Sequence, residues 1–391
     1  MKKNVWLIVL LLPWMMTVAQ DEEKVDFLFA GDIMTHGDQL RSAYYPEDSS
    51  WNFELWFEDI DHLLQAADFT IGNLETPLGI KPFKGYPSFG APVKLAEDLK
   101  NAGFNVLVTA NNHAFDRGKA GLVSTLDVLD SLDIHHTGTW RSDKERQQLT
   151  PLMLEKDGMR IAVLNYSYGS NAWPVPGMMA WINEIRMKEE IQAAQAQNPD
   201  KILVFMHWGN EYQSFPSQKQ KALKEKLSDW GADYVIGAHP HVLQPMEWHH
   251  DNAGESFVAW SLGNLISNMY FKRTDGGALL HMQLRKENGE VSISKAGYIL
   301  LYVYKYRDEN NHIQYRLRPI HEYSGHPECF ADDAYEKMLK YKSLADPVMK
   351  YNINVPAWED EIYTSYEEKT EYIPKLGFPV MPVKYRLQSG K

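Results

Sequence analysis

The sequence predicts an α/β protein, in which helices cover the faces of a β-sheet. Segments rich in aliphatic and aromatic residues alternate with segments of helical periodicity through most of residues 25–265. Several of the predicted strands are followed directly by Asp, Glu, Asn or His, at the position where α/β folds bind their ligands. The chain is also long enough to bury a large core, because 44% of its 391 residues are hydrophobic.

The first half of this region contains four predicted strands with helices between them. The strands cover residues 25–30, 68–71, 105–109 and 134–137, and the helices cover residues 52–67, 92–102 and 119–132. Each helix is predicted from apolar residues that recur at a spacing of three or four. In the last strand, the adjacent His135 and His136 would point to opposite faces, which favours a structural role for both.

The second half continues the alternation. A hairpin around Asp157 and Gly158 is predicted to pair two further strands. Its strands cover residues 151–155 and 160–165, other strands cover residues 201–206, 233–237, 257–262, 278–284 and 291–301, and helices cover residues 184–196 and 216–230. Beyond them, a hairpin of residues 302–306 and 313–318 and a helix over residues 332–344 are predicted. We therefore predict one domain over residues 25–300 and a C-terminal extension over residues 301–391.

The N-terminus has the features of a secretory signal peptide. Lys2 and Lys3 precede an apolar run over residues 5–16, and residues 17–19 form a cleavage box. The run is shorter than the about 20 residues that a transmembrane helix needs, although an uncleaved anchor is the alternative. We predict that residues 1–19 are removed and that the mature chain has no transmembrane helix. It would then be exported to the periplasm or to the extracellular side of the cell envelope.

The charge and the cysteine content narrow the function classes. The formal net charge of -12 argues against a nucleic-acid partner and against an anionic membrane surface. It would also repel a polyanionic substrate, unless metal ions or a local basic patch offset the charge. Because Cys329 is the only cysteine, the chain has no internal disulfide and must be stabilised by its core.

Candidate metal ligands follow five of the predicted strands. They are Asp32, Glu75, Asn112, His207, and the pair His239 and His241. Pro240 separates the two histidines of the pair and stiffens the loop, so that little entropy is lost when both bind one ion. The set combines carboxylates, an amide oxygen and imidazoles without a thiolate, which suits one or two divalent ions of Mn, Fe or Zn. Two ions bridged by a carboxylate favour hydrolysis, because they hold both the attacking and the leaving oxygen.

A candidate catalytic pair lies next to one of these ligands. His113 can protonate a leaving group, and Asp116 can orient it. The alternative is that both residues only cap the helix that follows. Trp208, Trp173 and Trp181 also have two interpretations, because such residues either line a groove for a polymer or pack in the core.

Six short motifs occur in order over residues 26–270. They are Gly31-Asp32-Ile33-Met34, Gly72-Asn73-Leu74-Glu75-Thr76, Asn111-Asn112-His113 with Asp116 and Gly118, His207-Trp208-Gly209-Asn210-Glu211-Tyr212, Gly237-Ala238-His239-Pro240-His241-Val242 with Gln244, and Ser261-Leu262-Gly263-Asn264. In this combination the chain resembles the CapA family of capsule or poly-γ-glutamate synthesis proteins, within the calcineurin-like metallophosphoesterase superfamily.

The resemblance implies a four-layer α/β/β/α sandwich of the metallo-dependent phosphatase type, with a small C-terminal extension. It carries metal-ligand roles onto the six candidate ligands and a proton-donor role onto His113, with Asp116 beside it. Other polar and aromatic residues of the motifs are predicted to contact substrate: Asn73, Asn111, Trp208, Glu211 and Asn264.

Three positions depart from the superfamily pattern. Met34 stands where the first motif has histidine, Glu75 stands where the second has aspartate, and Ala114 follows His113 where an acidic residue is usual. One metal site is therefore a ligand short, unless His36 supplies the ligand or a single ion binds tightly.

Three functions fit these observations. The first is metal-dependent hydrolysis or processing of a cell-envelope polymer, such as poly-γ-glutamate or capsule, or of a related ester or amide. The second is a non-catalytic accessory role in capsular polymer synthesis or export, with the polymer bound through the metal site. The third is a plain binding module with a vestigial site. The predicted partners are a polyanionic envelope polymer or the capsule synthesis machinery, and not nucleic acid.

Overall fold

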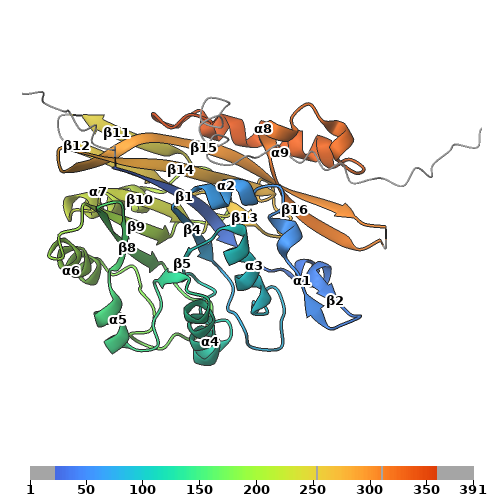
Figure 1. Ribbon diagram of the computed structural model, residues 1–391, viewed down its shortest axis with the longest axis horizontal. Coiled ribbons are helices and arrows are strands. Elements are labelled where there is room, and N and C mark those ends of the chain that lie inside the picture. Colours follow the sequence, from blue (N-terminus) through green and yellow to red (C-terminus); the bar gives the residue numbers. More distant parts are fainter. Residues whose placement is uncertain (1–22, 252–253, 310, 359–391) are drawn as a thin grey trace, which may run out of the picture.

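Two large β-sheets pack face to face, and helices cover their outer faces (Figure 1). The computed structural model describes residues 23–251, 254–309 and 311–358. The predicted signal peptide over residues 1–19 lies outside the described residues. Residues 359–391 of the predicted extension also lie outside them. Among the residues that are described, every helix is too short or too polar to cross a membrane.

The first sheet joins parallel strands from the N-terminal half to antiparallel strands from the C-terminal half. Its described strands pair in the order β16 (Ile313–Pro319), β15 (Glu290–Arg307), β14 (Gly276–Glu287), β1 (Glu23–Ile33), β4 (Phe69–Leu74), β5 (Val106–Val108) and β6 (His135–Thr137), and β13 (Asn264–Ile266) pairs with β1. Because β1, β4, β5 and β6 run parallel, their carboxyl ends lie at the same edge of the sheet.

The second sheet is mostly parallel. Its described strands pair in the order β11 (Met246–Asp251), β12 (Gly254–Ala259), β10 (Tyr234–Ala238), β9 (Lys201–His207), β8 (Met159–Ser167) and β7 (Leu152–Lys156). The four central strands run parallel, and β11 and β7 pair antiparallel at the two edges. A separate short pair consists of β2 (Tyr44–Tyr45) and β3 (Ser50–Trp51).

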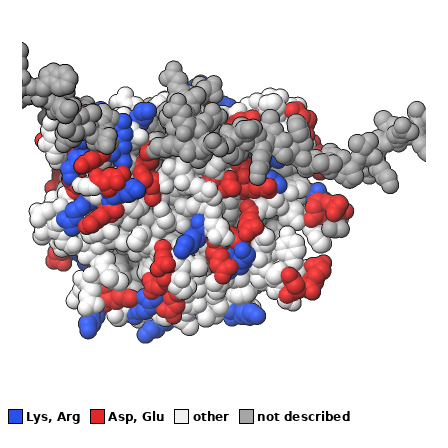
Figure 2. Space-filling model, viewed as in Figure 1, with Lys and Arg blue, Asp and Glu red and all other residues white. Residues whose placement is uncertain are grey.

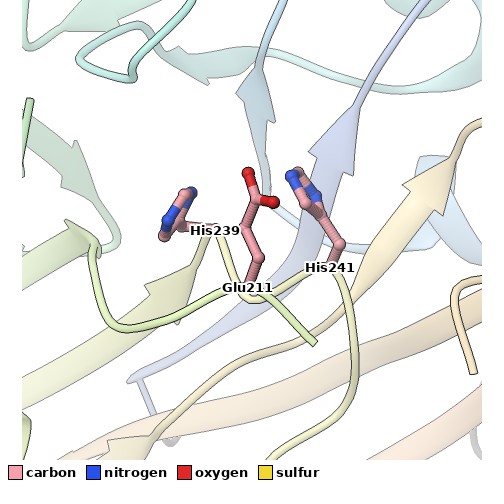
Figure 3. A group of neighbouring side chains, drawn as sticks. All are labelled: Glu211, His239 and His241. Atoms are coloured by element: carbon pink, nitrogen blue, oxygen red, sulfur yellow. The ribbon is translucent and has the colours of Figure 1, made fainter. Parts of the chain in front are cut away.

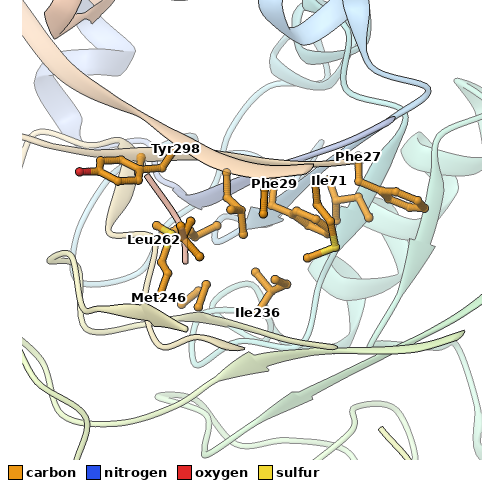
Figure 4. Close-up of a cluster of buried hydrophobic side chains, with 14 of the residues drawn as sticks. Phe27, Phe29, Ile71, Ile236, Met246, Leu262 and Tyr298 are labelled. Carbon is orange, nitrogen blue, oxygen red and sulfur yellow. The ribbon is translucent and has the colours of Figure 1, made fainter. Parts of the chain in front are cut away.

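One apolar core fills the space between the two sheets (Figure 4). Along β1, Phe27 and Phe29 point into this space, whereas Leu28 points to the outer face of the sheet. Ile71 of β4 and Ile236 of β10 belong to the same cluster, so that both sheets contribute to it. Burying a large apolar side chain stabilises the fold by about 1.5–3 kcal/mol, and the cluster therefore holds the sheets together.

Helices form the two outer layers. The outer face of the first sheet is covered by α1 (Gly37–Ala43), the 3₁₀ helix η1 (Glu54–Trp56), α2 (Asp61–Ala66), α3 (Lys94–Ala102) and part of α4 (Gly118–Ser131). The outer face of the second sheet is covered by α6 (Glu184–Gln195) and α7 (Gln218–Asp229). The order of helices, sheet, sheet and helices confirms the predicted four-layer α/β/β/α sandwich.

The chain beyond residue 300 packs against the first sheet. It contains α8 (Ile320–Tyr323), η2 (Pro327–Cys329) and α9 (Ala334–Met349), and α8 and α9 lie over β15 in Figure 1. Met338 and Tyr341 of α9 belong to the cluster between the sheets. β15 passes through residues 300 and 301 without a break, so the start of the predicted extension continues the sheet. The division at residue 300 stays a prediction.

The prediction of one continuous helix over residues 52–67 is wrong. The structure has η1 and α2 there, separated by a turn. In this turn, Glu58 and Asp59 pair with Arg316 of β16, and Ile60 adopts φ -134°, which interrupts the helix. Of the apolar residues at helical spacing, Leu55 is half-buried and the other five are buried: Phe53, Trp56, Ile60, Leu63 and Leu64. The long-range ion pairs lie at the turn that divides the helix.

Further differences concern elements without an apolar pattern. α5 (Asp143–Leu149) and β11 have no counterpart in the prediction, because α5 buries only Arg146 and four of the six residues of β11 are charged or histidine. The strands predicted over residues 291–301 and 302–306 form one strand, β15.

Candidate metal centre

The six predicted metal ligands converge where the parallel strands of the two sheets end. Asp32 lies in β1, His207 ends β9, and the other four lie in the loops that follow β4, β5 and β10. Each of the six is at most 3% exposed. Residues from both sheets therefore share one buried centre, at the edge where α/β folds bind ligands.

A β-bulge in β1 directs Asp32 into this centre. Asp32 pairs with Asn73 of β4, and Ala30 pairs with the residue directly before it, so that Gly31 is an extra residue in β1. A Cβ atom at Gly31 would lie 1.9 Å from the carbonyl oxygen of Gly263. Only glycine fits at this position, which explains why the motif has glycine directly before the aspartate.

We expect Gly31→Ala to destabilise the protein by about 3 kcal/mol, because the added methyl group collides with backbone and not with a flexible side chain. Urea unfolding measures the loss. Gly169→Ala is the matched control, because a Cβ atom there meets nothing within 4 Å. Equal stability of the two variants would contradict this account of the bulge.

Three candidate ligands form an inner group, which consists of Asp32, Glu75 and His207. Their ligand atoms lie within 4.8 Å of one another. His207 Nε2 lies 3.6 Å from Glu75 Oε1 and 2.7 Å from Asn112 Oδ1. Ion–ligand bonds are about 2.0–2.2 Å long, so ligand atoms on one ion lie up to about 4 Å apart. Burial, and then the neighbouring His239, lower the pKa of His207 well below its usual value, which keeps the neutral form that binds metals.

His241 is oriented by two oxygen atoms. Its Nδ1 lies 3.0 Å from Asp32 Oδ2 and 3.0 Å from Asn264 Oδ1, so that Nδ1–H donates and Nε2 is left for an ion. Nε2 lies 4.0 Å from Glu75 Oε1. Burial lowers the pKa of His241, but the hydrogen bond to Asp32 and its negative charge outweigh burial and raise the pKa overall.

The loop that carries the two histidines is strained. His239 and His241 have φ values of 97° and 57°, which residues with a side chain rarely adopt. Such strain costs about 1–3 kcal/mol for each residue and persists where the surroundings enforce it. Here the backbone N–H of His239 donates to Asp32 Oδ2 at 3.2 Å, and Figure 3 shows both imidazoles on the same side of the loop.

Buried polar atoms without partners mark where ions fit. Both oxygens of Glu75 and Nδ1 of His239 are buried and have no hydrogen-bond donor or acceptor partner among the described residues. Burial and the negative charge of Asp32 raise the pKa of Glu75 well above its usual value, and burial and His241 lower the pKa of His239 to about 3. An unpaired buried polar group costs about 1–3 kcal/mol, which a bound cation would remove. The residues present therefore fit a divalent-metal centre.

His113 and Asp116 form a hydrogen-bonded pair beside the ligands. His113 Nδ1 lies 2.7 Å from Asp116 Oδ2, and His113 Nε2 lies 3.3 Å from Asn171 Nδ2. The ring of Phe89 packs edge-on against His113, with centroids 4.6 Å apart. The N-cap residue of α4 is Arg117, so a capping role for the pair has no support in the structure.

Three asparagines that were predicted to contact substrate hold ligands in place. Asn73 donates to Asp32 Oδ1 at 2.7 Å, and Asn111 donates to Asn73 Oδ1 at 3.2 Å. Asn264 accepts from His241, as described above. All three are buried, which favours a supporting role beneath the ligands over direct contact with a substrate.

The structure corrects the prediction for Trp208 and separates the three tryptophans by burial. Trp208 is 2% exposed and donates from Nε1 to the carbonyl oxygen of Trp260 at 3.2 Å, so it packs in the core and does not line a groove. Trp181 is partly buried against the cluster near α4. Trp173 is 96% exposed, and groove lining stays a prediction for this residue.

Two neighbours of the centre were missed by sequence reasoning. The Tyr168 ring lies 4.3 Å from the ring of His239, and Asn171 contacts His113. Both follow β8, which ends beside β9, and that position at a strand end was the available signal. His36, the predicted substitute for the missing histidine, instead accepts a hydrogen bond at Nδ1 from the backbone N–H of Asn268 at 3.2 Å.

A family model matches the part of the chain that contains the candidate centre. The model of the bacterial capsule synthesis protein family PGA_cap matches residues 26–269, which include all six candidate ligands. The chain belongs to this family. The resemblance predicted from the motifs is thereby confirmed.

Two curated bacterial proteins are similar to this chain. It is 28% identical to "Capsule biosynthesis protein CapA" of Bacillus anthracis, over 69% of this chain and 66% of that protein. It is 31% identical to "PGA biosynthesis protein CapA" of Bacillus subtilis strain 168, over 59% of this chain and 61% of that protein. The chain thus spans less than two thirds of the length of the curated relatives that it matches.

Solved structures that match this chain have lower sequence identity to it than these two relatives. One is a phosphatase from Mycoplasma pneumoniae, with 17% identity and a TM-score of 0.43 over 71% of this chain and 94% of that chain. Another is a calcineurin-like phosphoesterase from Bacillus subtilis, with 13% identity and a TM-score of 0.40 over 71% of this chain and 90% of that chain. The PGA_cap family and the geometry of the centre remain the basis for proposing a function.

Proposed function

We propose that this chain is an exported protein that binds divalent ions at the centre and hydrolyses or otherwise processes a cell-envelope polymer. Poly-γ-glutamate, another capsular polymer or a related ester or amide is the substrate class. The observation that carries the proposal is the buried carboxylate of Glu75, which has no hydrogen-bond partner in the described part of the chain, beside the hydrogen-bonded pair of His113 and Asp116. A metal site that only stabilises a fold needs no such pair at its edge.

Divalent ions bound at the centre would act as Lewis acids that polarise the bond to be cleaved. The residues of the chain supply proton transfer. Asp116 holds the proton on His113 Nδ1 and stabilises the positive charge of the ring when Nε2 is also protonated. His113 Nε2 then donates its proton to the leaving oxygen or nitrogen. Asn171 Nδ2, 3.3 Å away, donates to Nε2 while that nitrogen carries no proton.

Exposed aromatic side chains beside the centre provide a contact surface for a polymer. Tyr168 is 46% exposed and contacts the His239 ring, and the exposed Phe271 packs 4.4 Å from the Tyr212 ring. Aromatic residues are enriched where proteins bind partners. On the face shown in Figure 2, Lys and Arg lie among Asp and Glu. The positive charge that a polyanion requires would therefore come chiefly from the ions.

A non-catalytic accessory role in capsular polymer synthesis or export is the second candidate. Two observations favour it: Met34 occupies a position where the superfamily pattern has a metal-binding histidine, and the relatives are named biosynthesis proteins. In this role the metal centre binds a carboxylate-rich chain without cleaving it.

The test is a screen of the Mn²⁺-loaded protein against phosphoesters and γ-glutamyl peptides, with chelator-treated protein as control. Turnover that disappears with the chelator and returns with Mn²⁺ supports the hydrolase. Metal-dependent binding of poly-γ-glutamate without turnover supports the accessory role. Protein that neither binds nor cleaves any of these compounds would overturn both.

A further inference from the structure

We infer that Glu211 is a metal ligand and that it supplies the coordination that Met34 cannot provide. An outer group of Glu211, His239 and His241 would then hold the second ion of the centre. This inference rests on the proposed metal-dependent function. It changes the role of Glu211, which the sequence places among the substrate-contacting residues, and it resolves which residue replaces the missing histidine.

The first observation is the position of the Glu211 carboxylate. Its ligand atoms and those of His239 and His241 lie within 4.8 Å of one another. Figure 3 shows the carboxylate between the two imidazoles, although Glu211 comes from the loop after β9 and the histidines come from the loop after β10. A carboxylate and two imidazoles are a common ligand set for Mn²⁺, Fe²⁺ and Zn²⁺.

The second observation is a buried atom without a hydrogen-bond partner on one of these three residues. His239 is 3% exposed, and its Nδ1 has no hydrogen-bond partner among the described residues. Buried imidazole nitrogens are almost always paired, so this atom needs an explanation. A cation between Nδ1 and the carboxylate of Glu211 supplies one.

The third observation is that the loop of Glu211 is fixed although its side chain is exposed. The backbone N–H of Tyr212 donates to the carbonyl oxygen of Pro240 at 2.8 Å, which ties this loop directly to the His239–His241 loop. Tyr212 has φ 64°, a strained value, and Arg273 donates to its carbonyl oxygen at 3.3 Å. Strain enforced by tertiary contacts beside a polar cluster is typical of a functional position.

Met34 cannot serve as a hard ligand at the centre. It is buried and carries only a thioether, which is a soft ligand with little affinity for Mn²⁺. The exposed carboxylate is thus the available hard ligand on the open side of the centre.

The two groups predict two unequal sites. The inner group is fully buried, whereas the outer group includes an exposed ligand on a loop. The outer ion should therefore exchange faster with solvent. Replacing imidazole by carboxylate at this site also favours Mn²⁺ over softer ions.

The test counts ions in three proteins. Wild type, Glu211→Gln and the control Glu225→Gln are loaded with Mn²⁺, freed of unbound metal by gel filtration and measured by mass spectrometry. Glu225 is a matched control because it is an exposed glutamate on α7. We expect two ions per chain in wild type and in Glu225→Gln, and one in Glu211→Gln. Electron paramagnetic resonance should show coupled Mn²⁺ ions in the first two proteins and isolated ions in the third.

Two ions in both wild type and Glu211→Gln would overturn this inference and leave the proposed function standing. Wild-type protein that binds no Mn²⁺ would overturn the inference and the proposed metal-dependent function together. Glu211 is exposed, so its replacement by glutamine should leave the fold intact, and circular dichroism checks this.

Discussion

His113→Ala is expected to lower turnover by about 10²–10⁴-fold, the usual contribution of a positioned general acid. Its metal content should equal that of wild type. The reason is that His113 contacts Asp116 and Asn171 and belongs to neither group of candidate metal ligands in the described part of the chain. The measurement is kcat on the best substrate of the screen, with metal content determined on the same preparation.

His135→Ala is the control, because this exposed histidine begins β6, away from the edge where the ligands meet. Unchanged turnover in His113→Ala would remove His113 from the mechanism. Loss of bound metal in this variant would instead give the residue a structural role at the centre.

Glu75→Gln is expected to change stability in opposite directions with and without metal. In metal-free protein, the substitution should stabilise the fold by about 1–3 kcal/mol, because it removes a buried carboxylate that has no donor among the described residues. With Mn²⁺ at 100 times its Kd, wild type should gain about 2.7 kcal/mol from binding, and the variant should gain much less. Urea unfolding with chelator and with Mn²⁺ measures both effects.

The two unfolding curves should therefore exchange their order when Mn²⁺ is added. Glu225→Gln, an exposed change on α7, should follow wild type under both conditions. A variant that is less stable than wild type even with chelator would show that Glu75 has a protein partner and would contradict its assignment as an orphaned ligand.

Sequence reasoning succeeded where a local pattern sets the structure. Apolar segments such as the one with Phe27 and Phe29 predicted most of the strands, within a single sheet with helices on its faces. The second sheet was predicted only from the resemblance to the family. Polar residues at strand ends predicted which side chains gather, because the ligand-binding edge of a parallel sheet is where its strands end. Asp32 of the first sheet and His207 of the second lie 3.9 Å apart because the two sheets pack with these edges together. The motif order then predicted the family.

The features that sequence reasoning did not predict depend on contacts between residues far apart in the chain. The helix predicted over residues 52–67 is divided by a turn in which Asp59 pairs with Arg316, far along the chain. Trp208 follows the candidate ligand His207, at the end of β9, yet its ring stacks on Trp260 in the core. The position of Glu211 depends on the strained Tyr212 and its bond to a second loop, and no local pattern encodes that contact.

The most direct test of the central claim is the metal content of protein purified without chelator, compared between wild type and His239→Ala. His239 is a member of the outer group and also lies beside His207 of the inner group, with ring centroids 4.8 Å apart. The account predicts close to two divalent ions per chain in wild type and a clear loss in His239→Ala. Wild-type protein without metal above background, or equal metal content in both proteins, would contradict it.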